Sequence, residues 1–404
     1  MHVYLIATLD TKGAEAAFVR DRLVSKGATV KLIDAGCQGS PSIAADIKRE
    51  EVFAAAGADL GEARSKGDRG EAVATAARGA AAMVRVAHEK GELAGVMAIG
   101  GSAGTTIGTT AMRALPLGVP KVMVSTLASG QVRPYVGDKD IFMLNSVVDI
   151  AGLNRISRPI LANAAAAMAG MISMPPLPSG DDKPLIAATM FGVTTPCVNH
   201  AREILEQAGF EVLVFHATGS GGRAMESLIE DGVIAGVLDI TTTELADELV
   251  GGVLSAGPDR LNAAARRGIP QVVSVGAIDM VNFGPRDTAP AKFEGRKFHI
   301  HNPTITLMRT TAAENAKLGE EIGRKVAASK GPAKILLPRQ GVSAIDRAGQ
   351  PFDDPAAREK LFVGVKSTCG PVECQEVDLH INDPAFAEAA ANALIQMIAA
   401  KATQ

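Results

Sequence analysis

The chain of 404 residues is longer than a usual single domain, so its length predicts two domains, each large enough to bury its own core. Hydrophobic residues make up 47% of the chain and its formal net charge is −3, which is typical of an ordinary globular protein. There is no basic tract, Trp is absent and Tyr occurs twice, so the sequence offers neither the charge nor the aromatic platforms of nucleic-acid binders. We expect no nucleic acid partner.

Cysteine content and hydropathy indicate a cytoplasmic protein with no membrane partner. The cysteines are Cys37, Cys197, Cys369 and Cys374. Four are few for a disulfide scaffold of this length and favour reduced thiols. Residues 1–6 are strand-like and have no basic region or cleavage site of a signal peptide. The longest segment of low polarity, residues 161–174, is shorter than the roughly 20 apolar residues that span a bilayer, so we expect a buried helix there.

Short apolar runs alternate with Ala-rich helical stretches along the chain, which predicts an α/β fold of two Rossmann-like domains with mostly parallel sheets. Strands are predicted at 3–9, 29–34, 95–99, 121–125, 185–190, 211–215, 236–240 and 271–275. Helices fill the gaps, for example at 13–26 and 69–90. Residues 174–184 gather prolines, a glycine and charges, the composition of a linker. We therefore expect one domain at 1–175 and a second domain at 184–404.

The second half of the chain repeats the first. Blocks match in the same order: 5–9 with 186–190, 27–34 with 209–215, 93–97 with 234–238, and 118–125 with 268–275. The repeat predicts two related units that face a shared cleft, with ligands at the loops that leave the strand ends.

A glycine-rich loop, AIGGSAGTT at residues 98–106, follows the third predicted strand. Glycines let the backbone approach a ligand closely, and the next helix offers unpaired N–H groups to an anion. The loop has neither the Gly-Lys-Ser/Thr of a Walker A loop nor a GxGxxG fingerprint, so a plain turn between strand and helix is the alternative to a phosphate cradle. The candidate binding residues here are Gly100, Gly101, Ser102, Gly104, Thr105 and Thr106.

Loops after three other predicted strands supply further candidates. Lys12 could neutralise phosphate and Asp10 could hold Mg²⁺ or a ribose hydroxyl, whereas the structural alternative is that Asp10 or Thr11 only caps the next helix. Asp34 ends the second strand, where an acid often meets ribose in such folds. The candidates from these loops are Thr8, Asp10, Thr11, Lys12, Asp34, Ser125 and Thr126.

Several blocks together resemble a known family. They are TLDTKG at 8–13, GGSAGTT at 100–106, LPLGVPKVMVSTLASG at 115–130, DIAGLN at 149–154 and HNPTITLMRTT at 301–311. The chain resembles the amino-terminal region of the plant tobamovirus-resistance ATP-binding proteins and their stand-alone bacterial relatives, over nearly its whole length. The resemblance implies a two-domain α/β protein that binds ATP, forms a homodimer, and holds the nucleotide at Thr8–Lys12 and Gly100–Thr106. The antiviral role of the plant members depends on a viral partner and is not carried over.

The second half places acids where the first half has glycines. Residues 241–248 occupy the slot of the glycine loop and contain Glu244 and Asp247, which could transfer protons or ligate a metal. Alternatively these acids only favour the dipole at a helix N-terminus. The turn at 219–222 is another possible anion nest. Asp239 lies within a predicted strand, where a buried carboxylate needs a partner.

Asp279 and a histidine pair complete the candidates of the second half. His299 and His301 stand two residues apart, a spacing that puts both rings on one face of a strand. Such a pair suits acid–base catalysis, or metal ligation together with Glu244 or Asp279, although the metal itself is not predicted. Arg309 could clamp a carboxylate or phosphate, or else pair with an acid of the protein.

These features predict an ATP-binding protein, with Mg²⁺, that acts as a cytoplasmic enzyme on a small anionic substrate in the interdomain cleft. One alternative is a non-catalytic nucleotide-binding regulatory module. The other is a metal-dependent lyase or hydrolase of a phosphorylated metabolite, in which the glycine loop holds the substrate phosphate.

Overall fold

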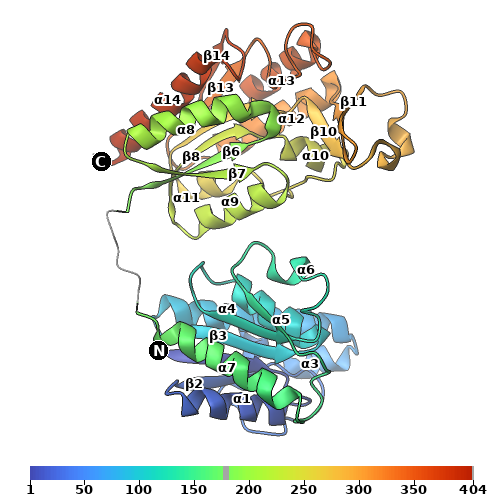
Figure 1. Ribbon diagram of the computed structural model, residues 1–404, viewed down its shortest axis with the longest axis vertical. Coiled ribbons are helices and arrows are strands. Elements are labelled where there is room, and N and C mark those ends of the chain that lie inside the picture. The colour runs from blue at the N-terminus through green and yellow to red at the C-terminus, as the bar shows by residue number, and fades with distance from the viewer. Residues whose placement is uncertain (176–181, 403–404) are drawn as a thin grey trace. The chain divides into compact units, whose positions relative to one another are not determined.

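The computed structural model describes residues 1–175 and 182–402 and divides into two compact units, Met1–Pro178 (unit 1) and Ser179–Gln404 (unit 2). Each unit has a parallel sheet with helices packed on both faces (Figure 1), so the expected α/β fold of two Rossmann-like units is confirmed. Most of the linker predicted at 174–184 falls on residues 176–181, which lie outside the described residues.

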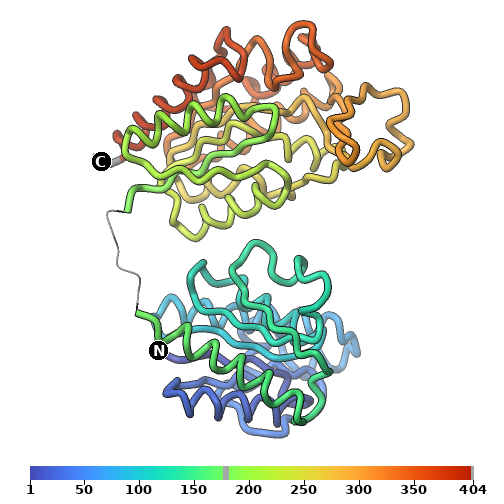
Figure 2. Tube along the Cα trace, in the orientation of Figure 1, coloured from blue at the N-terminus to red at the C-terminus, as the bar shows by residue number. Residues whose placement is uncertain are grey.

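Unit 1, coloured from blue to green in Figure 2, has a five-stranded parallel sheet in the order β2-β1-β3-β4-β5. Its strands are β1 (His2–Ala7), β2 (Val30–Asp34), β3 (Leu93–Gly100), β4 (Lys121–Ser125) and β5 (Phe142–Asn145). Its helices are α1 (Gly13–Ser25), α2 (Arg49–Ala55), α3 (Leu60–Ser65), α4 (Arg69–Glu89), α5 (Ser102–Arg113), α6 (Arg133–Val136) and α7 (Ser157–Ser173). Apolar residues of α1 and α7 bury one face of the sheet, and those of α2, α4 and α5 bury the other.

Unit 2 has a six-stranded parallel sheet in the order β14-β13-β9-β8-β6-β7 and a separate antiparallel sheet in the order β10-β12-β11. The parallel strands are β6 (Leu185–Met190), β7 (Glu211–His216), β8 (Ile234–Thr241), β9 (Gln271–Gly276), β13 (Ala333–Pro338) and β14 (Glu373–Val377). The antiparallel strands are β10 (Met280–Phe283), β11 (Phe298–Asn302) and β12 (Ile305–Arg309). The helices are α8 (Thr195–Gln207), α9 (Ser220–Glu230), α10 (Glu244–Val250), α11 (Ala263–Arg267), α12 (Ala312–Ala327), α13 (Pro355–Thr368) and α14 (Pro384–Ala402).

The internal repeat is present in the strand order and in one irregularity that both sheets share. The order β2-β1-β3-β4 in unit 1 is repeated as β7-β6-β8-β9 in unit 2. The pairing of β1 with β3 skips Ala94, and that of β6 with β8 skips Ala235, at the same place in the matched blocks. Val3 pairs with Gly95 as Ile186 pairs with Gly236. The structural equivalent of Ile186 is therefore Val3, two residues before Leu5, the residue that the predicted match of 5–9 with 186–190 aligns with it.

The eight predicted strands are confirmed. The edge strands β5 and β14 were missed because both are short, and the antiparallel strands β10 and β12 were not predicted either. The sequence of β14, ECQEV, has no apolar run and none of its residues is fully buried. The helix expected at 161–174 is α7, but only one side of it is buried, and Met171 is 37% exposed. None of the described helices is both long and apolar enough to cross a membrane.

Candidate functional site

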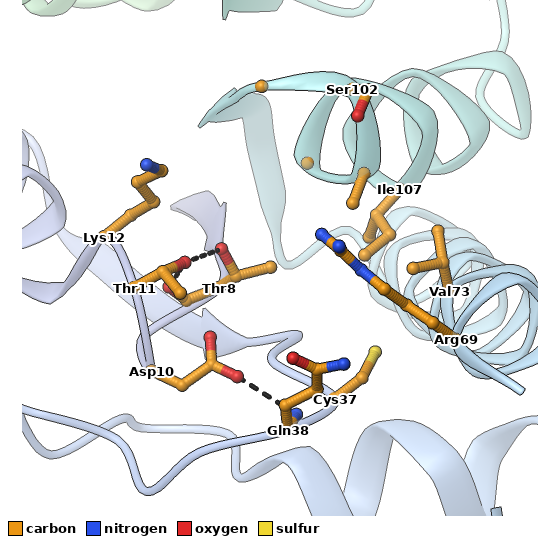
Figure 3. Close-up of a pocket in the computed structure, with 13 residues that line it drawn as sticks. Thr8, Asp10, Thr11, Lys12, Cys37, Gln38, Arg69, Val73, Ser102 and Ile107 are labelled. Atoms are coloured by element: carbon orange, nitrogen blue, oxygen red, sulfur yellow. Dashed lines mark hydrogen bonds between the residues drawn. The ribbon is translucent and has the colours of Figure 1, made fainter. Parts of the chain in front are cut away.

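A cavity of about 220 Å³ lies in unit 1 beside the loops that follow β1, β2 and β3 (Figure 3). In the order β2-β1-β3-β4-β5 the chain winds outward from β1 in one direction and from β3 in the other. Ligands of open α/β sheets bind outside the carboxyl ends of the strands at this switch point. The cavity is lined by Thr8, Asp10, Thr11, Lys12, Cys37, Gln38, Arg69, Val73, Gly101, Ser102, Ala103, Gly104 and Ile107.

The N-terminus of α5 forms one wall of the cavity. The cap residue Gly101 has no side chain to accept a hydrogen bond, and the first helical bond runs from Thr105 N to Gly101 O at 2.8 Å. In the described structure the N–H groups of residues 102–104 therefore have no protein acceptor. A Cβ on Gly100 would lie 2.7 Å from Gly104 Cα, so the turn into the helix requires glycine. This wall presents free N–H donors, as anion-binding helix N-termini do.

Two cationic side chains line the same cavity. Arg69, the first residue of α4, extends into it toward Ser102 and Ile107 (Figure 3), and within residues 1–175 and 182–402 its guanidinium makes no hydrogen bond or ion pair. Lys12 Nζ donates to the carbonyl oxygen of Ile150 in the block DIAGLN. The cavity therefore combines N–H donors with two positive charges, one of which has no protein partner in the described structure.

The residues expected after β1 line the cavity, but Asp34 does not. Thr8 Oγ1 and Thr11 Oγ1 lie 2.9 Å apart, and Asp10 Oδ2 accepts from Gln38 N at 3.1 Å. Asp34 is 2% exposed and accepts from Leu9 N at 3.1 Å. It also accepts from Gly36 N at 2.9 Å and from Arg49 Nε at 2.6 Å. Asp34 thus ties the loops after β1 and β2 together, and the ribose contact predicted for it has no support from its position.

The other predicted hydroxyls are bonded within the protein. Thr105 Oγ1 lies 2.7 Å from Ser125 Oγ, and both residues are fully buried. Thr106 Oγ1 donates to Ser102 O at 3.0 Å, within α5. Thr126 is half-buried and does not line the cavity. These residues support the loops, whereas Ser102 is the hydroxyl of the glycine loop that faces the cavity.

In unit 2 the matching slot is filled by the protein itself. Glu244 is fully buried, and its Oε1 accepts from Gly219 N at 2.6 Å and Gly222 N at 3.0 Å. Its Oε2 accepts from Arg260 Nε at 2.7 Å. Arg260, also fully buried, is the partner that Asp239 required, at 2.5 and 2.7 Å. The anion nest predicted at 219–222 therefore binds an anion, and that anion is Glu244.

The family of the chain is settled by comparison with known proteins. Residues 1–176 match the N-terminal domain and residues 183–398 the C-terminal domain of the family described as "Uncharacterised protein family (UPF0261)". The chain belongs to the UPF0261 family. It is 49% identical to the UPF0261 protein of Clostridium tetani over 98% of both chains, and 47% identical to that of Mesorhizobium japonicum over 96% of this chain and 97% of that protein.

The expected resemblance to the plant proteins is confirmed as well. The UPF0261 chain is 45% identical to the "ToMV resistance protein Tm-1(GCR237)" of Solanum lycopersicum. The match covers 81% of this chain and 45% of the tomato protein, so this chain corresponds to less than half of that relative.

The remaining acids and Arg309 of this UPF0261 chain lie in the interior of unit 2. Asp247 and Asp279 are fully buried, and burial raises the pKa of each carboxyl to about 7. Ser343 Oγ donates to Asp279 at 2.8 Å, and the nearby Asp346 contributes to the raised pKa. Arg309 is 5% exposed and donates to Phe352 O at 2.8 Å and to Asp346 at 3.3 Å. Asp279, Asp346 and Arg309 belong to one internal polar network, and the carboxylate of Asp247 is bonded to Asn282.

The histidine pair does not keep the arrangement that its spacing predicts. The pairing of β11 with β12 shifts between Ile300 and Asn302, so His301 lies at an irregularity and leaves the regular alternation. His299 packs edge-on against Phe352 at 6.2 Å between ring centroids, and His301 is exposed. In the described ranges no group of three or more His, Cys, Asp or Glu side chains is placed to hold a metal, so the expected joint site with Glu244 or Asp279 is not found there.

Arg69 is the charged lining residue that was not among the predicted site residues. A helix between two parallel strands runs back against them, so its first residue lies at the carboxyl edge of the sheet, beside the strand-end loops. The predicted helix at 69–90 begins with this arginine, directly after its N-cap Asp68. The position of Arg69 at the start of a predicted helix was therefore the feature of the sequence that could have identified it as a site residue.

Proposed function

We propose that unit 1 of this UPF0261 protein binds the phosphate groups of ATP in the cavity beside β1 and β3. The observation that carries the proposal is the free N-terminus of α5, which faces a cavity lined by Lys12 and by the unpartnered guanidinium of Arg69. Free N–H groups and nearby cations are the donor set that phosphate oxygens require.

The contrast between the units supports the proposal. By the match of 93–97 with 234–238, Ala103 in unit 1 corresponds to Glu244 in unit 2. Glu244 brings a carboxylate to its slot, whereas the methyl group of Ala103 leaves room for an anion from solution. The slot of unit 1 thus has the free N–H groups of an anion site, and its glycine loop brings no carboxylate of its own to them.

A second cavity extends the space available to the rest of the nucleotide. It has about 190 Å³ and shares Cys37, Gln38 and Arg69 with the first cavity. Binding pockets for small molecules and cofactors have volumes of about 300–1,000 Å³, so each cavity alone holds only part of a nucleotide. We place the phosphates in the first cavity and the nucleoside in the second, with Arg69 between them. Asp10 is the carboxylate that would hold the accompanying Mg²⁺.

The burial of the predicted catalytic acids favours a nucleotide-binding regulatory module over an ATP-dependent enzyme acting on a small anionic substrate. Glu244 is engaged by three donors and Asp279 is fully buried, so neither reaches a substrate without rearrangement. Release of phosphate from bound ATP at a rate that falls in Lys12→Ala would reverse this preference.

The free cysteines and the family resemblance lead us to propose a cytoplasmic homodimer.

Calorimetric titration of the whole chain with ATP, ADP, AMP and inorganic phosphate, each with and without Mg²⁺, tests the proposal. We expect ATP to bind in the titration. When the concentration of free ATP is about 100 times its Kd, binding should also raise the free energy of unfolding by about 2.7 kcal/mol. Arg69→Ala should weaken binding. Arg78→Ala is the matched control, because Arg78 lies on the same helix, exposed and paired with Glu71 at 3.0 Å. Absence of binding by every adenine nucleotide would refute the proposal.

A further inference from the structure

We propose that unit 2 contains an internal anion site, formed by Gly219, Gly222 and Arg260, which holds the carboxylate of Glu244 as its ligand and accepts a free small carboxylate when Glu244 is shortened. The inference concerns unit 2 alone and does not depend on nucleotide binding by unit 1.

The glycine turn is shaped around a carboxylate. Gly219 has φ +81°, a positive value that favours glycine, and its N–H and that of Gly222 converge on the same oxygen of Glu244, at 2.6 and 3.0 Å. A Cβ on Gly222 would lie 2.1 Å from the other carboxylate oxygen. Converging N–H groups of this kind form a concave nest for an anion. The turn therefore fits a carboxylate closely and leaves no space for a side chain at 222.

Arg260 is held in place independently of Glu244. Its Nε donates to Glu244 at 2.7 Å, while Nη1 and Nη2 bond the two oxygens of Asp239 at 2.5 and 2.7 Å. Asp239 in turn accepts from Thr189 Oγ1 at 2.7 Å. Two of the three guanidinium nitrogens therefore stay fixed when Glu244 is removed, and Nε stays directed at the vacated position.

The ligand class follows from what the substitution removes. Glu244→Ala deletes a CH₂–COO⁻ group whose oxygens accept from the backbone N–H groups of Gly219 and Gly222 and from Arg260 Nε. All three of these donor residues are buried. Acetate, CH₃–COO⁻, has the same two carbons and two oxygens as the deleted group, so it matches that group in size and charge. Its binding would also restore the negative charge opposite Nε, and pairing a buried charge stabilises the fold.

Thermal unfolding of Glu244→Ala in sodium acetate, compared with sodium chloride at equal ionic strength, tests the inference. We expect acetate to raise the midpoint of Glu244→Ala with a logarithmic dependence on concentration, and to leave wild type and Glu244→Gln at their chloride values. The glutamine of Glu244→Gln fills the same volume, so it separates an occupied site from a general effect of acetate.

Refolding covers the case in which Glu244→Ala does not fold in chloride alone. The recovered folded fraction should then be several-fold larger after dilution from denaturant into acetate than into chloride. Equal behaviour in acetate and chloride, by midpoint or by recovery, overturns the inference. An equal acetate shift in all three proteins also overturns it. Both results are independent of nucleotide binding, which is measured on wild type.

Discussion

Asn282 Nδ2 donates a 2.7 Å hydrogen bond to the carboxylate of Asp247 in the interior of unit 2. The backbone N–H groups of Asn282 and Leu254 add two more, each at 3.1 Å. These donors favour the charged carboxylate, but burial outweighs them and raises its pKa to about 7. Asn282 Oδ1, in turn, is buried and has no hydrogen-bond partner in the described structure.

Relative to wild type, the Asp247→Asn variant should therefore be more stable at pH 8 than it is at pH 5. The folded-state pKa of about 7 lies above the unfolded value of about 3.9, so the native state binds more protons between them and wild-type stability falls as pH rises through this window. The variant lacks this loss, and a flipped Asn282 amide can accept from the new NH₂ group. The difference in unfolding free energy, variant minus wild type, should grow by on the order of 1–4 kcal/mol from pH 5 to pH 8.

The exposed substitution Asp287→Asn is the control for that measurement. It changes the net charge equally, and its difference from wild type should stay flat over the same pH range. Asp279 titrates in the same window with the same sign, so the comparison is between variants and never the slope of wild type alone.

Ala103→Glu should weaken anion binding by unit 1. The substitution places a carboxylate at the position that Glu244 holds in unit 2, inside the cavity proposed for phosphates. Like charges exclude one another at such distances, so we expect ATP affinity to fall by at least about tenfold, which is about 1.4 kcal/mol. Ala103→Gln has the same bulk without the charge. Equal losses in both variants would assign the effect to volume, and unchanged affinity in both would place the ligand elsewhere.

Gly108→Ala should destabilise unit 1 while Gly170→Ala does not. A Cβ at residue 108 would lie 2.4 Å from Ala98 Cβ, so α5 would have to move off β3. We expect a cost of about 1–3 kcal/mol in chemical denaturation. A Cβ at residue 170 of α7 meets nothing within 4 Å, and a helical alanine there should gain up to about 1 kcal/mol. A cost at 170 equal to that at 108 would contradict the packing of α5.

Arg260→Met should cost about 3–5 kcal/mol, because it leaves Asp239 and Glu244 buried without their cation. Arg266→Met is the matched control on the adjoining helix. Arg266 is 49% exposed and pairs with Glu230 at the surface, so its loss should cost less than about 1 kcal/mol. Equal costs for the two substitutions would show that the buried cluster adds nothing.

Features that depend on local sequence pattern could be predicted from the sequence, whereas contacts between side chains far apart in the chain could not. Buried parallel strands such as β3 and β8 are apolar over most of their length, so their positions and the repeat could be predicted. Glu244 followed a strand in the expected slot, but its partner Arg260 stands 16 residues away in a segment without a motif. Nothing in the sequence distinguishes a carboxylate offered to a substrate from one bound by an arginine of its own chain. The shift at His301 was hidden for the same reason, since pairing is a property of two strands.

The filled slot of unit 2 also limits how the protein can respond to its ligand. If unit 1 alone takes a ligand from solution, each chain titrates as a single independent site and gives a hyperbolic curve. A Hill coefficient above 1 then requires communication between at least two chains. The steepness of a binding curve would in that way report assembly, and diluting the protein until the curve becomes hyperbolic would measure the strength of the contact between subunits.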